Sequence, residues 1–318
     1  MSLGLVLGGG GVVGIAYHAG VLKALAEVWG VGPDDADVVI GTSAGSVVGA
    51  YLRTGREPLE LITEVIGDGD TLPSRPLPPV LDWGAASAVG WARRGLGTGW
   101  VLARSLGRRL PSPPVPAVLG RVFPAGLAAM ADGKARLRAD LPSGWPEQEL
   151  WLTAVDLVSG RRMVLGRDGG RSLPLPDAVR ASCAIPVVYP PVRLGRRVLV
   201  DGGLHSAANL DLAAEADLDA VVAVLPLSYD PATPPGAVDA ITRRPGSRLL
   251  AREIEAVRRS GASLLLIRPD ATVVRAQGRN MMRTEGLAEV VRCAYEATCR
   301  QLESADRHVL SVRDQLAA

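Results

Sequence analysis

The sequence predicts an α/β fold with a mainly parallel central sheet covered by helices. A short apolar strand at residues 3–7 is followed by a glycine-rich loop, a helical pattern and a second apolar strand at 37–40. Strand, loop, helix and strand at this spacing form a βαβ unit, whose parallel strands need helices over them. Two further apolar runs, at 220–225 and 264–267, suit central strands of such a sheet.

The remaining elements follow from the same periodicities. Apolar residues recur at helical spacing over 16–29, which predicts the first helix. The patterns predict strands at 151–155, 162–165 and 197–200, the last ending at Asp201, and helices at 177–183, 247–259 and 285–303. Because no internal repeat or compositional boundary divides the chain, we expect one domain over residues 1–318.

One segment, residues 68–118, departs from this pattern. It is rich in proline and carries Trp83, Trp91 and Trp100 among several arginines. One interpretation is an irregular insertion whose tryptophans pack on the core. The other is a cap or lid over a lipid site, with tryptophan and arginine facing an interface. The second interpretation predicts that Trp91 and Trp100 engage lipid.

The composition favours a globular protein and gives no sign of nucleic-acid or zinc binding. With 47% hydrophobic and 21% charged residues the chain can build a large core, and a net charge of +2 gives no nucleic-acid footprint. The 3 cysteines and 3 histidines form no zinc-like cluster, so we expect reduced thiols and no metal. The first residues lack the pattern of a signal peptide, and no run of about 18 apolar residues occurs. We therefore expect a cytoplasmic protein whose membrane contact, where it has one, is peripheral.

Ser43 is the strongest candidate for a functional residue. It lies in a Gly-Thr-Ser-Ala-Gly pentapeptide, between the strand that ends at Ile40 and a helix-like run from Ser46. A serine on a sharp turn between strand and helix is a nucleophile elbow, and Gly41 and Gly45 make room for the tight turn. The positive end of the following helix favours an alkoxide there. An ordinary Gly-Ser turn before a helix gives the same pattern, so the choice between the two interpretations depends on the neighbouring motifs.

The glycine-rich loop at residues 8–14 allows two interpretations. Its consecutive backbone N–H groups could cradle a dinucleotide pyrophosphate or form an oxyanion hole. Gly9, Gly11 and Gly14 match a dinucleotide fingerprint, but that fold also needs an acidic residue at the end of the second strand. That place is taken by the Ser43 turn. Because both strands end at one sheet edge, the loop and Ser43 are expected to be neighbours, as acyl transfer requires.

A serine nucleophile also needs a base. His18 and His308 do not follow predicted strands, and His205 lies close behind the Asp201-Gly202-Gly203 turn. The aspartate closes a strand, and the two glycines leave space around its carboxylate. Such a carboxylate could take the serine proton itself, although Asp-Gly-Gly also occurs as an ordinary turn.

Together these motifs resemble the patatin-like phospholipases. The resemblance rests on Gly9-Gly10-Gly11 with Gly14, on Gly41 to Gly45, and on Asp201-Gly202-Gly203, in that order. Supporting stretches occur at residues 19–25, at 181–186 with Pro190-Pro191, and at Asn209, so the resemblance covers most of residues 3–215.

The resemblance implies a serine lipid acyl hydrolase on a three-layer α/β/α fold. Ser43 would attack the ester carbonyl, and Asp201 would be the general base of a Ser-Asp dyad without histidine. Gly9, Gly10 and Gly11, with the Val12 N–H, would hold the oxyanion. The expected partner is a lipid or other ester substrate, and no cofactor or metal is implied.

The sequence departs from the family pattern at one position, and two other functions would fit the same motifs. The family often has a basic residue where Val13 stands, which weakens the case for an anionic phospholipid over a neutral ester. A lipid-binding or regulatory protein with little turnover would use the same fold. Acyl transfer to an acceptor other than water would use the same residues.

Overall fold

The computed structural model describes the protein over residues 2–56, 131–167, 170–186, 188–236, 239, 247–304 and 312. The predicted insertion at 68–118, with Trp91 and Trp100, lies outside these residues. The chain divides into two compact units. The first comprises Met1–Pro73, Pro146–Trp151 and Ser206–Ala318, and the second comprises Ser74–Trp145 and Leu152–His205.

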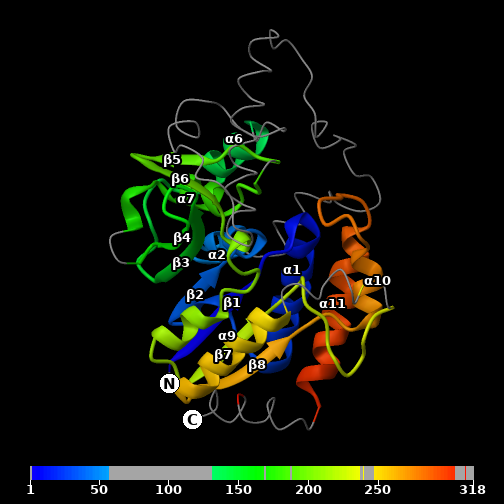
Figure 1. The fold of residues 1–318 in the computed structure, drawn as a ribbon. Helices are drawn as coiled ribbons and strands as arrows, with labels where there is room; N and C mark the ends of the chain where they lie inside the picture. The colour runs from blue at the N-terminus through cyan, green and yellow to red at the C-terminus, as the bar shows by residue number, and fades with distance from the viewer. Residues whose placement is uncertain are drawn as a thin grey trace. The chain divides into compact units, whose positions relative to one another are not determined.

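The first unit is built on a parallel sheet, which confirms the predicted α/β class. Its strands run in the order β2 (Val38–Gly41), β1 (Leu3–Leu7), β7 (Ala220–Val224) and β8 (Ser263–Ile267). In register, Leu7 lies opposite both Gly41 and Val224, and Val224 lies opposite Ile267. The carboxyl ends of all four strands therefore form one edge of the sheet, shown in Figure 1.

Helices cover this sheet on both faces. The chain runs from β1 through α1 (Gly11–Trp29) to β2, and from β7 through α9 (Ser247–Ser260) to β8, in opposite directions along the strand order. Right-handed crossovers in opposite directions place α1 and α9 on opposite faces. The helix α1 packs against α11 (Leu287–Leu302) and α2 (Ala44–Leu52), and α11 packs against α10 (Ala271–Gln277).

The helix α1 is unusually apolar. It is 19 residues long, and an 18-residue stretch of it has a mean hydropathy of 1.3, so by length and composition alone it could cross a membrane. The fold gives another reason for this composition, since Val13, Tyr17, Val21 and Leu25 are all buried.

The second unit contributes antiparallel strands, so the sheet of this protein is mixed. The strand β3 (Glu149–Asp156) enters this unit at Leu152, and from there it pairs with β4 (Arg161–Leu165) and with β6 (Arg197–Asp201), while β6 pairs with β5 (Val192–Leu194). An apolar cluster of Val155, Leu157, Val198 and Val200 stabilises these pairings. Among its described residues this unit has two helices, α6 (Ala131–Asp140) and α7 (Leu175–Ser182). Four 3₁₀ turns complete the described elements, at Pro33–Asp35, Gly170–Ser172, Gly202–Leu204 and Leu210–Glu215.

Three details differ from the sequence-based prediction. The first helix begins at Gly11 rather than near residue 16, because glycines are tolerated in a first turn whose N–H groups need no helical partner. The strand β8 ends the described strand order of its unit, although its apolar run predicts a central strand. The helix α10 was not predicted; its signal was Asp270, which caps the helix by accepting from the Val273 N–H at 2.8 Å.

Candidate active site

Ser43 lies on a turn with a strained backbone conformation. Its dihedrals are φ 52° and ψ −115°, a region that residues with a β-carbon rarely occupy. It directly precedes α2, and its carbonyl accepts from the Ser46 N–H at 2.8 Å and from the Ser46 hydroxyl at 2.6 Å. These bonds hold the turn in its strained form at the start of the helix. The Ser43 residue is 8% exposed.

The glycines around Ser43 allow the helix to approach the sheet. A β-carbon on Gly45 would overlap the Leu7 carbonyl oxygen and would lie 2.7 Å from the Leu7 Cβ. A β-carbon on Gly41 would lie 2.6 Å from the Gly45 carbonyl oxygen. At both glycines the nearest atoms to an added β-carbon belong to the backbone, so neither position can carry a side chain. This explains why the serine turn has glycine on either side.

The glycine loop lies beside the serine turn, as the shared sheet edge predicts. The Gly8 N–H donates to Val224, at the end of β7, at 2.9 Å. A β-carbon on Gly9 would lie 3.5 Å from the Ser43 Cβ. Backbone amides of the loop and the serine side chain thus occupy the same edge within the first unit.

The amides of this loop are not equally available. The Gly9 N–H, which the sequence resemblance included among the oxyanion donors, donates to the Ala207 carbonyl at 2.8 Å. By contrast, within the described residues the N–H groups of Gly10, Gly11 and Val12 donate to no hydrogen bond in the structure. Gly11 has φ 60° and forms the first turn of α1 with its neighbours. Three successive donors therefore remain at the positive end of a 19-residue helix.

The side chain of His18 holds the start of the glycine-rich loop in place. Its side chain is fully buried, and its Nε2 lies 2.8 Å from the Gly8 carbonyl oxygen. A carbonyl only accepts, so Nε2 carries the proton and donates it, and the buried Nδ1 has no partner within the described residues. The Gly8–Gly9 peptide is consequently held at both ends, by His18 and by Ala207. This structural role of His18 was not predicted; its signal in the sequence is a polar residue on the apolar helix that follows the loop.

The burial of His18 predicts a specific pH dependence of stability. Burial lowers the pKa of His18 to about 4, and the hydrogen bond to Gly8 opposes this only in part. The unfolded chain therefore binds the proton first, and the stabilising contribution of neutral His18 is complete above its unfolded pKa. It is lost as the pH falls from about 6.5 towards 4, by on the order of 3 kcal/mol.

This expectation can be tested with His18→Gln, which keeps an N–H donor but does not titrate. Urea unfolding of both proteins between pH 4 and pH 7 should give a steeper loss of unfolding free energy for the wild type. Carboxylates titrate equally in both proteins, so the difference isolates His18. Parallel curves would contradict the assignment.

Asn209 supports the serine turn from a distant part of the sequence. It is fully buried in the left-handed conformation, with φ 50°. Its Nδ2 donates to the Thr42 hydroxyl at 3.1 Å and to the Ser206 carbonyl at 2.6 Å. The residue noted in the sequence as motif support thus braces the residue before Ser43.

Asp201 belongs to the second unit, where its own surroundings are well defined. It ends β6 opposite Ala154 and is 5% exposed. Its N–H donates to Ala184 at 2.9 Å, which ties the aspartate to the 181–186 stretch. Its Oδ1 accepts from the Gly203 N–H at 2.7 Å. Gly202 leaves no room for a side chain, because a β-carbon there would lie 2.6 Å from the Thr153 carbonyl oxygen.

A comparison with known families decides the class of protein. The model of the patatin-like phospholipase family matches residues 5–214. The chain belongs to this family. The matched range begins in β1 and contains the glycine loop, Ser43 and Asp201.

Individual relatives of this patatin-like protein carry no stated activity. It is 32% identical to the uncharacterized protein YqhO of Bacillus subtilis over 219 residues, 63% of each chain. An uncharacterized NTE family protein of Mycobacterium tuberculosis is 28% identical over 254 residues, which are 77% of this chain and 34% of the relative. The chain thus spans less than two thirds of the length of either relative.

Two solved structures resemble this one weakly. VipD from Legionella pneumophila has a TM-score of 0.43 and 15% identity, over 95% of this chain and 67% of VipD. The type III effector ExoU has a TM-score of 0.39 and 18% identity, over 98% of this chain and 53% of ExoU. Both scores lie below 0.5, so the family assignment rests on the family match.

Proposed function

We propose that the protein is a serine lipid acyl hydrolase of the phospholipase A or carboxylesterase type. The observation that carries the proposal is the strained backbone of Ser43 at the start of α2. Strain of this kind persists where the surrounding structure enforces it, and it is common at catalytic residues. Family membership supports the same class of reaction.

The proposed reaction uses Ser43 as nucleophile and Asp201 as general base. The Ser43 Oγ attacks the ester carbonyl carbon while its proton passes to the Asp201 carboxylate. The tetrahedral intermediate then expels the alcohol, which takes the proton from Asp201, and an acyl-enzyme remains. Water attacks the acyl-enzyme after giving a proton to Asp201, and that proton returns to Ser43 as the fatty acid leaves.

The oxyanion would be stabilised by backbone donors of the glycine loop. Gly10, Gly11 and Val12 are the suitable donors, because the Gly9 N–H is already bonded to Ala207. Donors fixed in place before the reaction need no reorganisation when charge develops, and one such donor contributes about 10²–10³ in kcat.

A neutral ester is the better candidate substrate near the glycine loop. Val13 stands where the family often has a basic residue; its side chain is fully buried and its N–H donates to the Met281 carbonyl at 3.1 Å. No cation is therefore offered to a lipid phosphate from this position.

The test is replacement of Asp201 by asparagine. The asparagine oxygen can still accept from the Gly203 N–H, but the amide cannot take a proton, so we expect kcat for ester hydrolysis to fall by roughly 10²–10⁴. The measurement is release of fatty acid from acyl esters by the purified proteins, with folding checked by circular dichroism. Asp140→Asn, which makes the same change to a carboxylate of the same unit that pairs with Arg136, is the control. A folded Asp201→Asn protein with full turnover would exclude Asp201 as the base.

Product analysis separates the remaining alternatives. Hydrolysis predicts free fatty acid as the acyl product even when an alcohol or lysolipid is added. Acyl transfer predicts a new ester in the presence of that acceptor. A lipid-binding or regulatory protein predicts lipid binding without either product.

A further inference from the structure

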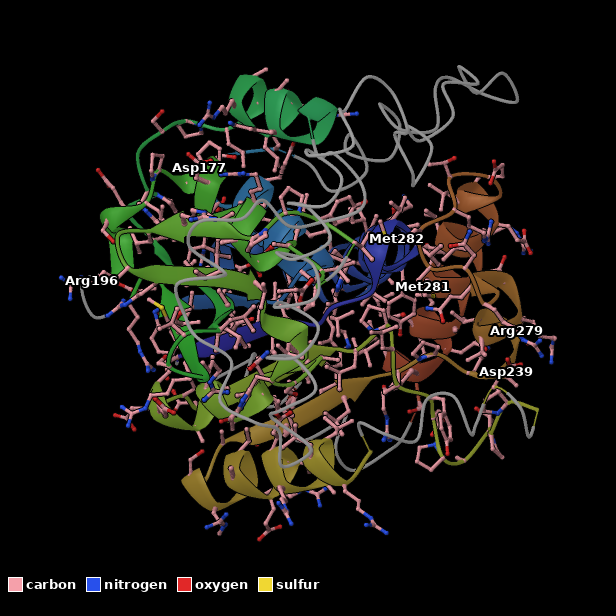
Figure 2. All side chains as sticks on the ribbon, turned by 45° about the horizontal axis from the view of Figure 1, so that its top comes forward. Asp177, Arg196, Asp239, Arg279, Met281 and Met282 are labelled. Atoms are coloured by element: carbon pink, nitrogen blue, oxygen red, sulfur yellow. The ribbon has the colours of Figure 1, made fainter. Side chains whose placement is uncertain are left out.

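The segment between α10 and α11, residues 278–286, lies against the glycine loop. The Met281 carbonyl accepts from the Val13 N–H in the first turn of α1, at 3.1 Å. A β-carbon on Gly11 would lie 2.5 Å from the Met281 oxygen and 2.9 Å from the Met282 sulfur. Figure 2 labels both methionines beside the start of α1. Met282 is therefore a neighbour of the unpartnered loop amides.

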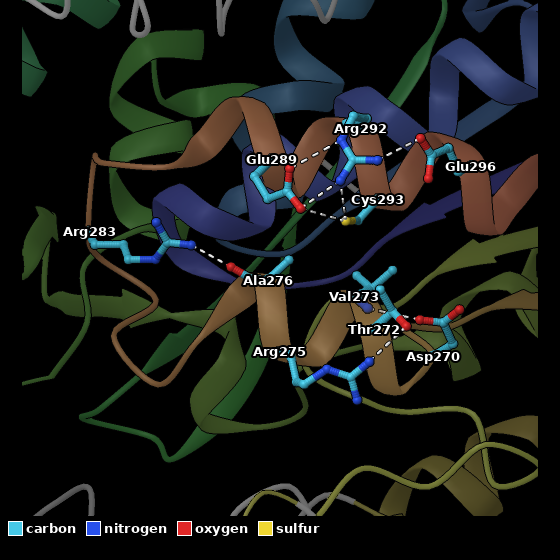
Figure 3. A network of polar contacts seen from close by, with 10 residues as sticks. All are labelled: Asp270, Thr272, Val273, Arg275, Ala276, Arg283, Glu289, Arg292, Cys293 and Glu296. Carbon is cyan, nitrogen blue, oxygen red and sulfur yellow. Dashed lines mark hydrogen bonds and ion pairs between the residues drawn. The ribbon is translucent and has the colours of Figure 1, made fainter. Parts of the chain in front are cut away.

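This segment is held in place by its own hydrogen bonds. Gly278 and Gly286, at its two ends, both have a positive φ, 64° and 65°, which favours glycine. Between them, the Arg283 guanidinium donates to the carbonyls of Ala276, Gln277 and Glu285. Figure 3 shows Arg283 reaching the end of α10. The position of the two methionines is thus determined by the fold.

A second apolar wall borders the same loop. A β-carbon on Gly10 would lie 2.8 Å from the Pro226 Cβ, so Pro226 packs directly on the loop. The Gln277 Nε2 donates to the Pro226 carbonyl at 3.3 Å and joins this wall to the end of α10. The next residue, Leu227, is 37% exposed and is the one large hydrophobic side chain exposed in the part of the chain that the structure describes.

The chemistry of this border suits an alkyl chain. Met281 and Met282 are half-buried and present thioethers, which are apolar and adapt to irregular shapes. The two cations of the segment already have partners: Arg283 donates to three backbone carbonyls, and Arg279 pairs with Asp239 at 3.4 Å, so they offer little to a charged head group. An ester carbonyl held by the amides of Gly10 to Val12 would bring its acyl carbons within reach of Met282.

We propose that Met282 is a specificity-determining residue that contacts the acyl chain of the substrate. The inference rests on the proposed function, and it adds that the acyl chain is the part of the substrate bound beside Met282. Removing the apolar surface at this position should weaken the binding of long chains and leave short chains unaffected.

The experiment compares Met282→Gln with Met282→Leu on p-nitrophenyl acetate and p-nitrophenyl octanoate. Met282→Gln has nearly the same shape but is polar, so we expect kcat/KM for the octanoate to fall about tenfold, mainly through KM. The value for the acetate should stay within about twofold, and Met282→Leu should behave like the wild type. Met163→Gln, on β4 of the other unit, is the matched control and should change neither value.

A second measurement does not depend on turnover. The rate at which an octyl phosphonate ester labels Ser43 should fall in Met282→Gln, while the rate for an ethyl phosphonate ester should not. An equal loss for both chain lengths, or no loss for either, would overturn the role of Met282. Absence of both labelling and turnover in the wild type would instead overturn the proposed function, and this inference with it.

Discussion

Replacing Ser43 with alanine is expected to lower ester hydrolysis by at least about 10⁴-fold and to abolish covalent labelling, while the protein stays folded. The hydroxyl is the group that forms the acyl-enzyme, and removal of a serine nucleophile in comparable enzymes costs about 10⁶ in kcat. The backbone bonds that hold the turn involve the Ser43 carbonyl, which alanine retains. The measurement is labelling with a fluorophosphonate probe together with kcat on an acyl ester.

Glycine at the same position distinguishes chemistry from backbone strain. Ser43→Gly should be as inactive as Ser43→Ala but more stable by roughly 1–3 kcal/mol, because glycine adopts φ 52° without steric cost. Ser260→Ala, on the last turn of α9, is the control for loss of a hydroxyl. A labelled Ser43→Ala protein would place the nucleophile elsewhere, and equal stabilities of the two variants would show that the turn stores no strain.

Replacing Gly45 with alanine is expected to destabilise the protein by more than about 3 kcal/mol. The new β-carbon would overlap the carbonyl oxygen of Leu7 in β1, a strand paired on both sides by β2 and β7. Backbone in an interior strand cannot move aside as a side chain can, so the overpacking penalty is large. It exceeds the gain in helix propensity, about 1 kcal/mol, that alanine brings to α2.

The control for this prediction is Gly144→Ala, since a β-carbon at Gly144 would meet no atom within 4 Å. Urea unfolding should show a large loss for Gly45→Ala and a change below about 0.5 kcal/mol for Gly144→Ala. If Gly45→Ala unfolds at the wild-type urea concentration, α2 does not approach β1 as closely as the structure indicates.

The regular elements of the first unit could be predicted closely from the sequence. Strands β1 and β7 and helices α9 and α11 appear within about two residues of their predicted limits. The two strands are buried over their whole length and appear in the sequence as continuous apolar runs, and the two helices show apolar residues at helical spacing. The antiparallel pairings of β3 to β6 were not predicted. Strand direction depends on how connections return across the sheet, and apolar runs do not encode it.

The candidate site was predicted in part. The turn at Ser43 and the neighbouring glycine loop follow from motifs, since tight turns demand glycine and parallel strands end at one edge. The sequence did not predict which of the loop amides are already hydrogen-bonded. The bond from the Gly9 N–H to the Ala207 carbonyl joins residues about 200 positions apart, and no local pattern indicates it. The contact of Asn209 with Thr42 joins residues 167 positions apart and is equally invisible to a local pattern. His18 lies only 10 positions from Gly8, but its bond to the Gly8 carbonyl depends on how α1 packs under the loop.

Local sequence alone determined that this protein has a βαβ unit, a serine on a sharp turn and a glycine loop before a helix, because backbone conformation and apolar periodicity depend on neighbouring residues. Only the tertiary structure decided which loop amides remain available, and that Met281 and Met282 border them. Those properties arise from contacts between distant segments, such as Met281 with Val13. Long-range contacts depend on packing of the whole core, which no short stretch of sequence specifies.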